Sequence, residues 1–285
     1  MRPARPPRVA ALTMVRDEAA LLPIWCAHYR RQVGAGNLFV LDHGTRDGST
    51  RDVPARVTAL PDGPLDEDVR LARVTEAVRA LLGTYDWVVH TDVDELVLAD
   101  PRHFPALADY AAAEPAPAAR AVGLDLHHIP AEEPALDPAL PLGAQRRWAR
   151  FSASMCKPAL VREAVQWTRG FHASEPPGRF GALYCVHLRY VDLGMGLVRL
   201  ARTRARELAP GTWPEHQRVA DEAFAAMMLG IAALPRQAGV PLDPALPPLR
   251  PWVERVQAGA PLTLAGDALW ELPERFRAEL ARPES

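Results

Sequence analysis

Apolar and polar positions alternate with two different periods through the first hundred residues. Short apolar runs bounded by charges are typical of buried strands, whereas apolar side chains three or four positions apart are typical of helices. Asp17 is placed to cap the first helix. The predicted strands are residues 9–15, 38–41, 69–71 and 86–90, and the predicted helices between them are residues 21–34 and 74–82. This order predicts an α/β fold, with a mainly parallel sheet flanked by helices.

The rest of the chain is less regular and becomes helical toward its end. The pattern predicts a helix at residues 104–113, strands at 121–129 and 183–188, and a proline-rich loop at 130–143. After Asp192 the pattern is helical. An uncharged run at residues 223–235 is too short to cross a bilayer, so we interpret it as a buried helix and expect no transmembrane segment.

An acidic pair follows the strand at residues 86–90. Asp92 and Asp94 are two positions apart, and in an extended segment such side chains point the same way, with Cα atoms about 6–7 Å apart. Two carboxylates at a strand end can bind one hard divalent cation, which can neutralise a diphosphate leaving group. The alternative is a solvated acidic loop that caps the next element. The sequence leaves both interpretations open.

Polar residues also follow the first two strands. Asp42 ends the second strand, where its carboxylate can accept hydrogen bonds from a ribose or a base, and Asp47 lies in the same turn-rich loop. Asx-turn chemistry is the favoured interpretation of both residues when they are considered alone. At the end of the first strand, Arg16 and its neighbours can contact a nucleotide.

Two histidines and one lysine are further candidates. Either His172 or His187 can complete a metal site with the acidic pair, or serve as a structural histidine bonded to the backbone. Lys157 is the single lysine of the chain, and its compact ammonium suits a phosphate or an acceptor carboxylate. A chance surface lysine is the alternative. The arginines between positions 199 and 206 are interpreted as a solvated helix face.

Composition restricts the functional class. The formal net charge of −2 argues against a dedicated binder of nucleic acid or of anionic membranes. The sequence has no P-loop, no nucleophile elbow and no HExxH segment. Its three cysteines are far apart and include no CxxC pair, which favours a reducing cytoplasm.

Several short segments follow one another in a recognisable order. They are residues 13–18, Trp25 with Tyr29, residues 40–48, the acidic segment 92–96, Lys157 with Pro158, residues 170–172 and residues 187–190. Together they resemble the glycosyltransferase family 2-like proteins of GT-A (Rossmann-like) fold, in particular a bacterial subgroup related to the family 92 transferases. The resemblance covers about residues 8–205.

The resemblance implies metal-dependent transfer of a sugar from a nucleotide-sugar donor, with a UDP-sugar preferred, to a glycan or small acceptor in polysaccharide biosynthesis. The cofactor would be Mn²⁺ or Mg²⁺. The metal residues would be Asp92, Asp94 and His187, and the nucleotide residues would be Val15, Arg16, Glu18, Asp42 and Asp92. The candidates for the catalytic base are Asp125, His172 and Glu175.

Two other functions stay open. An apolar strand that ends in two aspartates also begins metal-dependent phosphohydrolases of the haloacid-dehalogenase type. A non-catalytic relative would bind a glycan or a partner protein in the same cleft. For the domains, we expect residues 1–205 to bind the nucleotide sugar and perform catalysis, and residues 206–285 to form a helical appendage packed on them.

Overall fold

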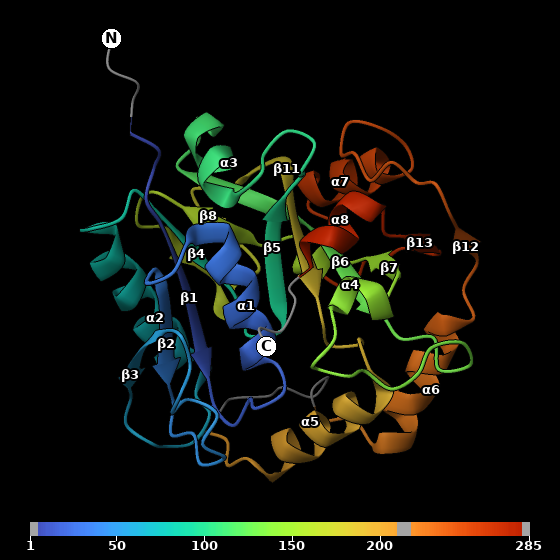
Figure 1. Ribbon diagram of the computed structural model, residues 1–285, viewed down its shortest axis with the longest axis horizontal. Coiled ribbons are helices and arrows are strands. Elements are labelled where there is room, and N and C mark those ends of the chain that lie inside the picture. Colours follow the sequence, from blue (N-terminus) through green and yellow to red (C-terminus); the bar gives the residue numbers. More distant parts are fainter. Residues whose placement is uncertain (1–4, 210–217, 281–285) are drawn as a thin grey trace.

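The computed structural model describes residues 5–209 and 218–280, and a sheet of eleven strands runs through this described part (Figure 1). The main path of the sheet is β12-β13-β7-β6-β8-β4-β1-β2-β3; off this path, β11 pairs with β6, and β5 pairs with β11. Its strands are β1 (Val9–Val15), β2 (Leu38–Asp42), β3 (Arg56–Ala59), β4 (Trp87–His90), β5 (Glu95–Ala99), β6 (Ala118–His127), β7 (Trp148–Phe151), β8 (Pro158–Val161), β11 (Arg179–His187), β12 (Arg236–Gln237) and β13 (Leu269–Glu271).

Helices and two small elements complete the described part. The helices are α1 (Leu22–Val33), α2 (Glu67–Leu82), α3 (Leu107–Ala113), α4 (Leu142–Gln145), α5 (Leu193–Ala205), α6 (Asp221–Ala232), α7 (Leu249–Gln257) and α8 (Glu274–Glu279). Strands β9 (Gln166–Trp167) and β10 (Ser174–Glu175) form a separate two-stranded sheet. Short 3₁₀ turns lie at Ala153–Met155 and Arg169–Phe171.

The N-terminal half of the sheet confirms the predicted α/β class. Strands β3, β2, β1 and β4 all run parallel. Alternate residues of β1 face opposite layers, because side chains of a strand alternate between the two faces of its sheet. Val9 and Ala11 belong to the hydrophobic cluster under α1, whereas Ala10 and Leu12 belong to the cluster under α2. Helices therefore cover both faces here.

The second half of the sheet mixes strand directions. Strand β11 runs parallel to β6 but antiparallel to β5, and β8 runs antiparallel to both β4 and β6. In this register His187 lies opposite Glu95 on one side and opposite Asp125 on the other. The polar residues at the ends of β5, β6 and β11 thus meet at the edge where β1 and β2 also end.

Helix α1 attaches to the β5 segment through two aromatic side chains. The Trp25 indole donates a hydrogen bond to Thr91 Oγ1 at 3.0 Å. The Tyr29 hydroxyl donates to the carbonyl of Glu95 at 3.1 Å and accepts from the N–H of Val97 at 2.9 Å. Among the described residues, β5 has only β11 as a strand neighbour. Tyr29 therefore occupies backbone groups on β5 that another strand would otherwise use.

Two local predictions near the N-terminus are wrong. Residues 69–71 are part of α2, which Asp66 caps by accepting from two N–H groups of the first turn, and the third strand is β3. All four residues of β3 are exposed, so it has no apolar run to reveal it. Asp17 caps no helix: α1 begins at Leu22, and the Asp17 carboxylate accepts instead from the N–H groups of Arg46 and Asp47.

The predicted buried helix at residues 223–235 is also wrong. Helix α6 lies on the surface, packed on α5 through Phe224 and Met228, while the Leu229 side chain is 52% exposed. Its apolar composition alone does not bury it, because it contacts a small satellite cluster and not the main core. No helix among the described residues is long and apolar enough to cross a membrane.

The C-terminal region contributes strands as well as helices. Strand β13 pairs with β7 and carries β12 at the rim of the sheet. Residues of α7 and α8 belong to the main hydrophobic cluster, in which Phe276 packs against Tyr184 of β11. Residues 210–217 and 281–285 of the expected appendage lie outside the described residues.

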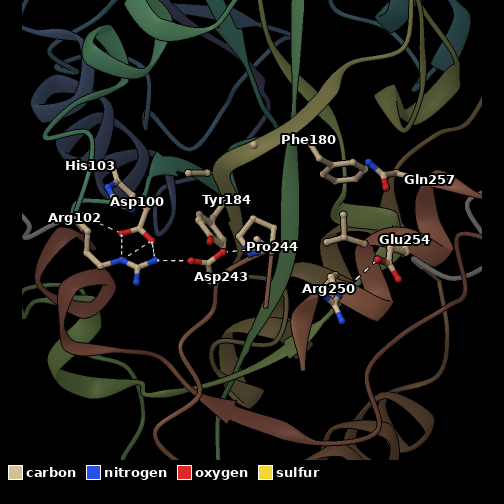
Figure 2. Close-up of a pocket in the computed structure, with 14 residues that line it drawn as sticks. Asp100, Arg102, His103, Phe180, Tyr184, Asp243, Pro244, Arg250, Glu254 and Gln257 are labelled. Carbon is tan, nitrogen blue, oxygen red and sulfur yellow. Dashed lines mark hydrogen bonds and ion pairs between the residues drawn. The ribbon is translucent and has the colours of Figure 1, made fainter. Parts of the chain in front are cut away.

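A cavity of about 490 Å³ lies at the end of β5 and β11 that is remote from the polar edge (Figure 2). Its most buried charge is Asp100, which is 1% exposed and accepts hydrogen bonds from Arg102 and Arg275. Arg102 also contacts Asp243 at 3.3 Å, and Arg250 lies 3.7 Å from Glu254. The charged groups of this cavity thus pair with one another.

Candidate functional site

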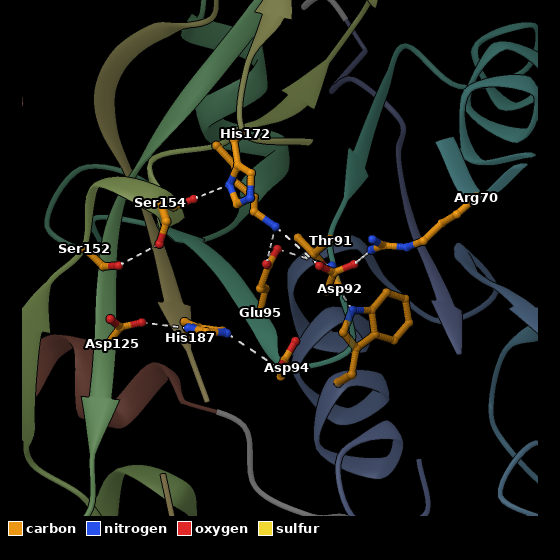
Figure 3. Close-up of polar contacts among 12 residues, drawn as sticks. Arg70, Thr91, Asp92, Asp94, Glu95, Asp125, Ser152, Ser154, His172 and His187 are labelled. Atoms are coloured by element: carbon orange, nitrogen blue, oxygen red, sulfur yellow. Dashed lines mark hydrogen bonds and ion pairs between the residues drawn. The ribbon is translucent and has the colours of Figure 1, made fainter. Parts of the chain in front are cut away.

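The acidic segment 92–95 leaves β4 in a turn and enters β5, at the carboxyl edge of the parallel strands (Figure 3). The turn separates the two aspartates that an extended segment would align. Asp94 points toward His187, whereas Asp92 points toward Arg70 (Figure 3). The prediction of two carboxylates side by side on one face is therefore wrong in its geometry.

Three side chains do come together as possible metal ligands. Asp94, Glu95 and His187 each offer one ligand atom, and these atoms lie within 4.8 Å of one another. All three residues are buried. Asp92 is not part of this group, and Glu95, which the sequence analysis did not single out, takes its place. The register of β5 on β11, which sets Glu95 opposite His187, is the signal that local sequence could not supply.

Asp125 positions the histidine. His187 Nδ1 lies 2.7 Å from Asp125 Oδ1, and its Nε2 lies 3.6 Å from Asp94 Oδ2 (Figure 3). Burial lowers the pKa of His187, but hydrogen bonds to Asp125 and Asp94 outweigh it and raise that pKa to about 9. A carboxylate on one nitrogen of a histidine is the usual partner of a metal ligand, because it fixes the ring and leaves the other nitrogen available.

A second ion-pair network lies behind this group. Lys157 Nζ is 2.6 Å from Glu95 Oε1 and 3.3 Å from Asp92 Oδ2, and Arg70 pairs with Asp92 from α2. Burial lowers the pKa of Lys157, but Glu95 and Asp92 outweigh it and hold that pKa above its ordinary value. The ammonium is thus engaged inside the protein, and its predicted contact with a phosphate or acceptor has no support in this geometry.

Arg199 of α5 is a site residue that the sequence analysis interpreted wrongly as part of a solvated face. Its Nη1 lies 2.7 Å from Asp94 Oδ2, and its Nη2 lies 3.0 Å from Glu18 Oε1. Burial raises the pKa of Asp94, but Arg199 and His187 outweigh it and hold the pKa of that carboxyl well below its usual range. Arg202 follows one turn later and contacts Glu18 at 3.5 Å.

The ends of β1 and β2 form a tightly bonded turn region. Asp42 accepts from the Thr45 N–H at 2.8 Å and from the Thr50 hydroxyl at 2.7 Å, as the Asx-turn interpretation expects. Val15 pairs with Asp42 in the sheet register. The Arg16 guanidinium donates to the carbonyl of Gly63 at 3.0 Å. Val15, Arg16 and Asp42 thus lie along one edge of the sheet.

Asp47 shares that turn chemistry. Its carboxylate accepts from the N–H groups of Ala19 and Ser49, at 3.2 Å and 2.9 Å. It therefore ties the loop after β2 to the segment after β1.

His172 and Glu175 are the remaining candidates for the catalytic base. His172 Nδ1 lies 2.8 Å from the carbonyl oxygen of Ser154 (Figure 3). Glu175 is exposed on β10, which pairs with β9 and not with the main sheet. Of the three candidates, Asp125 lies in direct contact with His187, at 2.7 Å.

No model of a known protein family matches the chain, and no curated protein matches it significantly. The predicted relation to the family 92 transferases therefore has no support. Among solved structures, the chain is similar to glucosyl-3-phosphoglycerate synthase from Mycobacterium tuberculosis, crystallised with Mn²⁺ and UDP. That match has 20% identity and a TM-score of 0.24, and covers 31% of this chain and 34% of the synthase. The chain thus spans about a third of that protein.

Two further similarities cover more of the chain. S. aureus TarS matches at 11% identity over 78% of this chain and 43% of its own, with a TM-score of 0.34. A mannose-1-phosphate geranyltransferase from Thermus thermophilus matches at 14% identity over 93% of this chain and 74% of its own, with a TM-score of 0.29. The α/β class rests on the sheet itself and the helices that flank it.

Proposed function

We propose that the chain is a family 2-like glycosyltransferase of GT-A type that uses Mn²⁺ or Mg²⁺. It would move a sugar from a nucleotide-sugar donor, with UDP-sugars the first to test, to a glycan or other acceptor. The observation that carries this proposal is the buried group of Asp94, Glu95 and His187 at the carboxyl edge of the sheet. Ligands of open α/β sheets bind at this edge.

The donor set fits a divalent cation. Carboxylate oxygens are the ligands of Mg²⁺ and Mn²⁺, and an imidazole nitrogen is a common third ligand of transition metals. Asp125 holds the His187 ring so that Nε2 faces Asp94. A bound cation would neutralise negative charge on the departing diphosphate. The burial of the three residues would exclude water from that position.

The neighbouring residues would then bind the donor. Val15, Arg16, Glu18 and Asp42 lie at the ends of β1 and β2 and would line the nucleotide pocket. Asp92 would not bind the metal directly. It would hold Lys157, which in turn pairs with Glu95. For the catalytic base the proposal keeps His172, Glu175 and Asp125.

The proposal also includes a cellular location and a biosynthetic process. Cys26, Cys156 and Cys185 are free thiols, which suits a cytoplasmic enzyme of polysaccharide biosynthesis. Residues 1–205 would supply the catalytic unit and residues 206–285 the region packed on it.

The test is the thermal stability of the protein with a panel of nucleoside diphosphates and nucleotide sugars, each with and without Mn²⁺. A ligand present at a hundred times its Kd stabilises the native state by ~2.7 kcal/mol, which is easily measured. We expect one nucleotide to raise the melting temperature only when Mn²⁺ is present. We expect Asp94→Asn to abolish that rise and Asp221→Asn, a matched change on exposed α6, to keep it.

A rise that is the same in wild type and Asp94→Asn would contradict the proposed site. A rise with Mn²⁺ alone, the same for every nucleotide, would favour a phosphohydrolase instead.

A non-catalytic relative is the second candidate, and one observation favours it. Basic side chains already neutralise the acidic segment: Arg70 and Lys157 on Asp92, Lys157 on Glu95, and Arg199 on Asp94. Such a protein would bind no Mn²⁺ and would turn over no nucleotide sugar. Measuring both separates the two candidates.

A further inference from the structure

We infer that Arg199 closes the cation site in the metal-free protein and moves to the donor diphosphate when a divalent cation binds. This inference rests on the proposed function and deepens it. It assigns one residue two successive partners, a carboxylate of the protein and then the diphosphate of the donor.

The first step is a conflict over a single oxygen atom. Asp94 Oδ2 is the atom that faces His187 Nε2 at 3.6 Å, and the same atom accepts from Arg199 Nη1 at 2.7 Å. Divalent cations bind carboxylate oxygens at about 2.0–2.2 Å. A cation between Asp94 and His187 would therefore lie next to a guanidinium of like charge. Repulsion between the two positive charges disfavours their binding to the same oxygen together, so we expect the cation to displace Arg199.

The second step concerns which basic group is able to leave. The Lys157 side chain is 7% exposed and lies between two carboxylates, Glu95 and Asp92. The Arg199 side chain is 22% exposed and extends from α5, a helix that Asp192 caps and Leu200 anchors in its own cluster. The greater exposure of Arg199 favours its release over that of Lys157. Arg199 is thus the residue that yields.

The third step is the destination of the guanidinium. In the structure Arg199 Nη2 lies 3.0 Å from Glu18 Oε1, which places the guanidinium near the carboxyl end of β1. A guanidinium is a planar fork of donors that matches phosphate oxygens in pairs. A diphosphate on the cation would bring such oxygens to this place. Cation and diphosphate therefore help each other to bind, and each raises the affinity of the other by the same factor.

The experiment measures Mn²⁺ binding by electron paramagnetic resonance of the free ion, first without nucleotide and then with saturating UDP. In wild type we expect weak binding that UDP tightens about tenfold or more. In Arg199→Gln we expect Mn²⁺ alone to bind about tenfold more tightly than in wild type, and UDP to add little. Arg204→Gln, on the same helix but paired with Asp221, should match wild type in both measurements.

Arg199→Lys guards against a folding defect. It keeps the positive charge but offers a single ammonium, so its Mn²⁺ affinity without nucleotide should lie between those of wild type and Arg199→Gln. Circular dichroism checks that each variant is folded.

Failure of the inference and failure of the proposed function give different results. If wild type binds Mn²⁺ and the two Arg199 variants bind it no more tightly, the inference is wrong and the metal site stands. If neither wild type nor any variant binds Mn²⁺, with or without UDP, the proposed function and the inference both fall.

Discussion

The two ends of the β5–β11 pair both bury a carboxylate against arginine, yet they differ in the other polar groups that lie beside that carboxylate. At the remote end, Asp100 accepts from Arg102 and Arg275. Arg102 also pairs with Asp243, and Arg250 lies near Glu254 (Figure 2). At the polar end, Asp94 meets Arg199 and also a histidine that a second carboxylate orients.

The difference teaches how to tell a structural ion pair from a binding site. At the remote end, both oxygens of the Asp100 carboxylate already accept hydrogen bonds from guanidinium groups of the fold. A histidine held by one carboxylate and aimed at another is arranged for a further partner. The two ends therefore make opposite predictions for similar substitutions.

The largest expected effect is on stability at the remote end. Asp100→Asn removes the buried negative charge that the partly exposed Arg102 and Arg275 share, and loss of hydrogen bonds to a buried charged group costs about 3 kcal/mol. Urea unfolding measures this loss. Mn²⁺ affinity should not change, and a changed affinity would mean that the two ends are coupled.

His28 of α1, which contacts the middle of β5, supplies a pH-dependent prediction. His28 is fully buried, with Nε2 2.9 Å from the carbonyl oxygen of Val97, and burial lowers its pKa to about 4. Below about pH 6.5 His28 takes up a proton in the unfolded chain but not in the folded protein. The free energy of unfolding is therefore unaffected by His28 above that pH and falls as the pH is lowered toward 4. By pH 5 this residue alone should cost about 2 kcal/mol.

Urea unfolding of wild type and His28→Gln at pH 7 and pH 5 measures that cost, since glutamine does not titrate. The variant should lose less stability than wild type between the two pH values. Equal losses would show that His28 is accessible to protons in the folded protein.

At the polar end, Asp125→Asn should weaken Mn²⁺ binding by about tenfold, since removing the partner of a metal-ligating histidine typically costs 10–100-fold in affinity. Asparagine still accepts from His187, so the fold should persist. Isothermal titration calorimetry gives the affinity. An unchanged affinity would make Asp125 as purely structural as Asp100.

The smallest effect is expected outside both ends, on α6. Leu229→Lys changes an exposed side chain, so the free energy of unfolding should change by no more than about 0.5 kcal/mol. Urea unfolding measures it. A loss above about 1 kcal/mol would show that this face is covered in solution.

Much of the fold could be predicted because the strands that matter most are buried on both faces. Strands β1, β2 and β4 are recognisable in the sequence as apolar runs for that reason. Strand β3 is exposed at every position and has no such run. Helix α6 shows the converse, since an apolar run there lies on the surface.

The site could be predicted only in part, because it depends on contacts between distant residues. Asp94 and His187 stand out by type and order, but the turn that directs Asp92 away from them leaves no mark on the sequence. Arg199 reaches Asp94 across 105 positions. On its own helix it looks like any other arginine, so local pattern could not assign it.

The Tyr29 hydroxyl, bonded to both Glu95 and Val97, has a consequence for the life of the chain in a crowded cell. An open strand edge is a template on which another chain can add and start an aggregate. By occupying these backbone groups, one side chain of α1 makes β5 a poor template. Strand β5 is thereby protected from pairing with a strand of another copy of this chain.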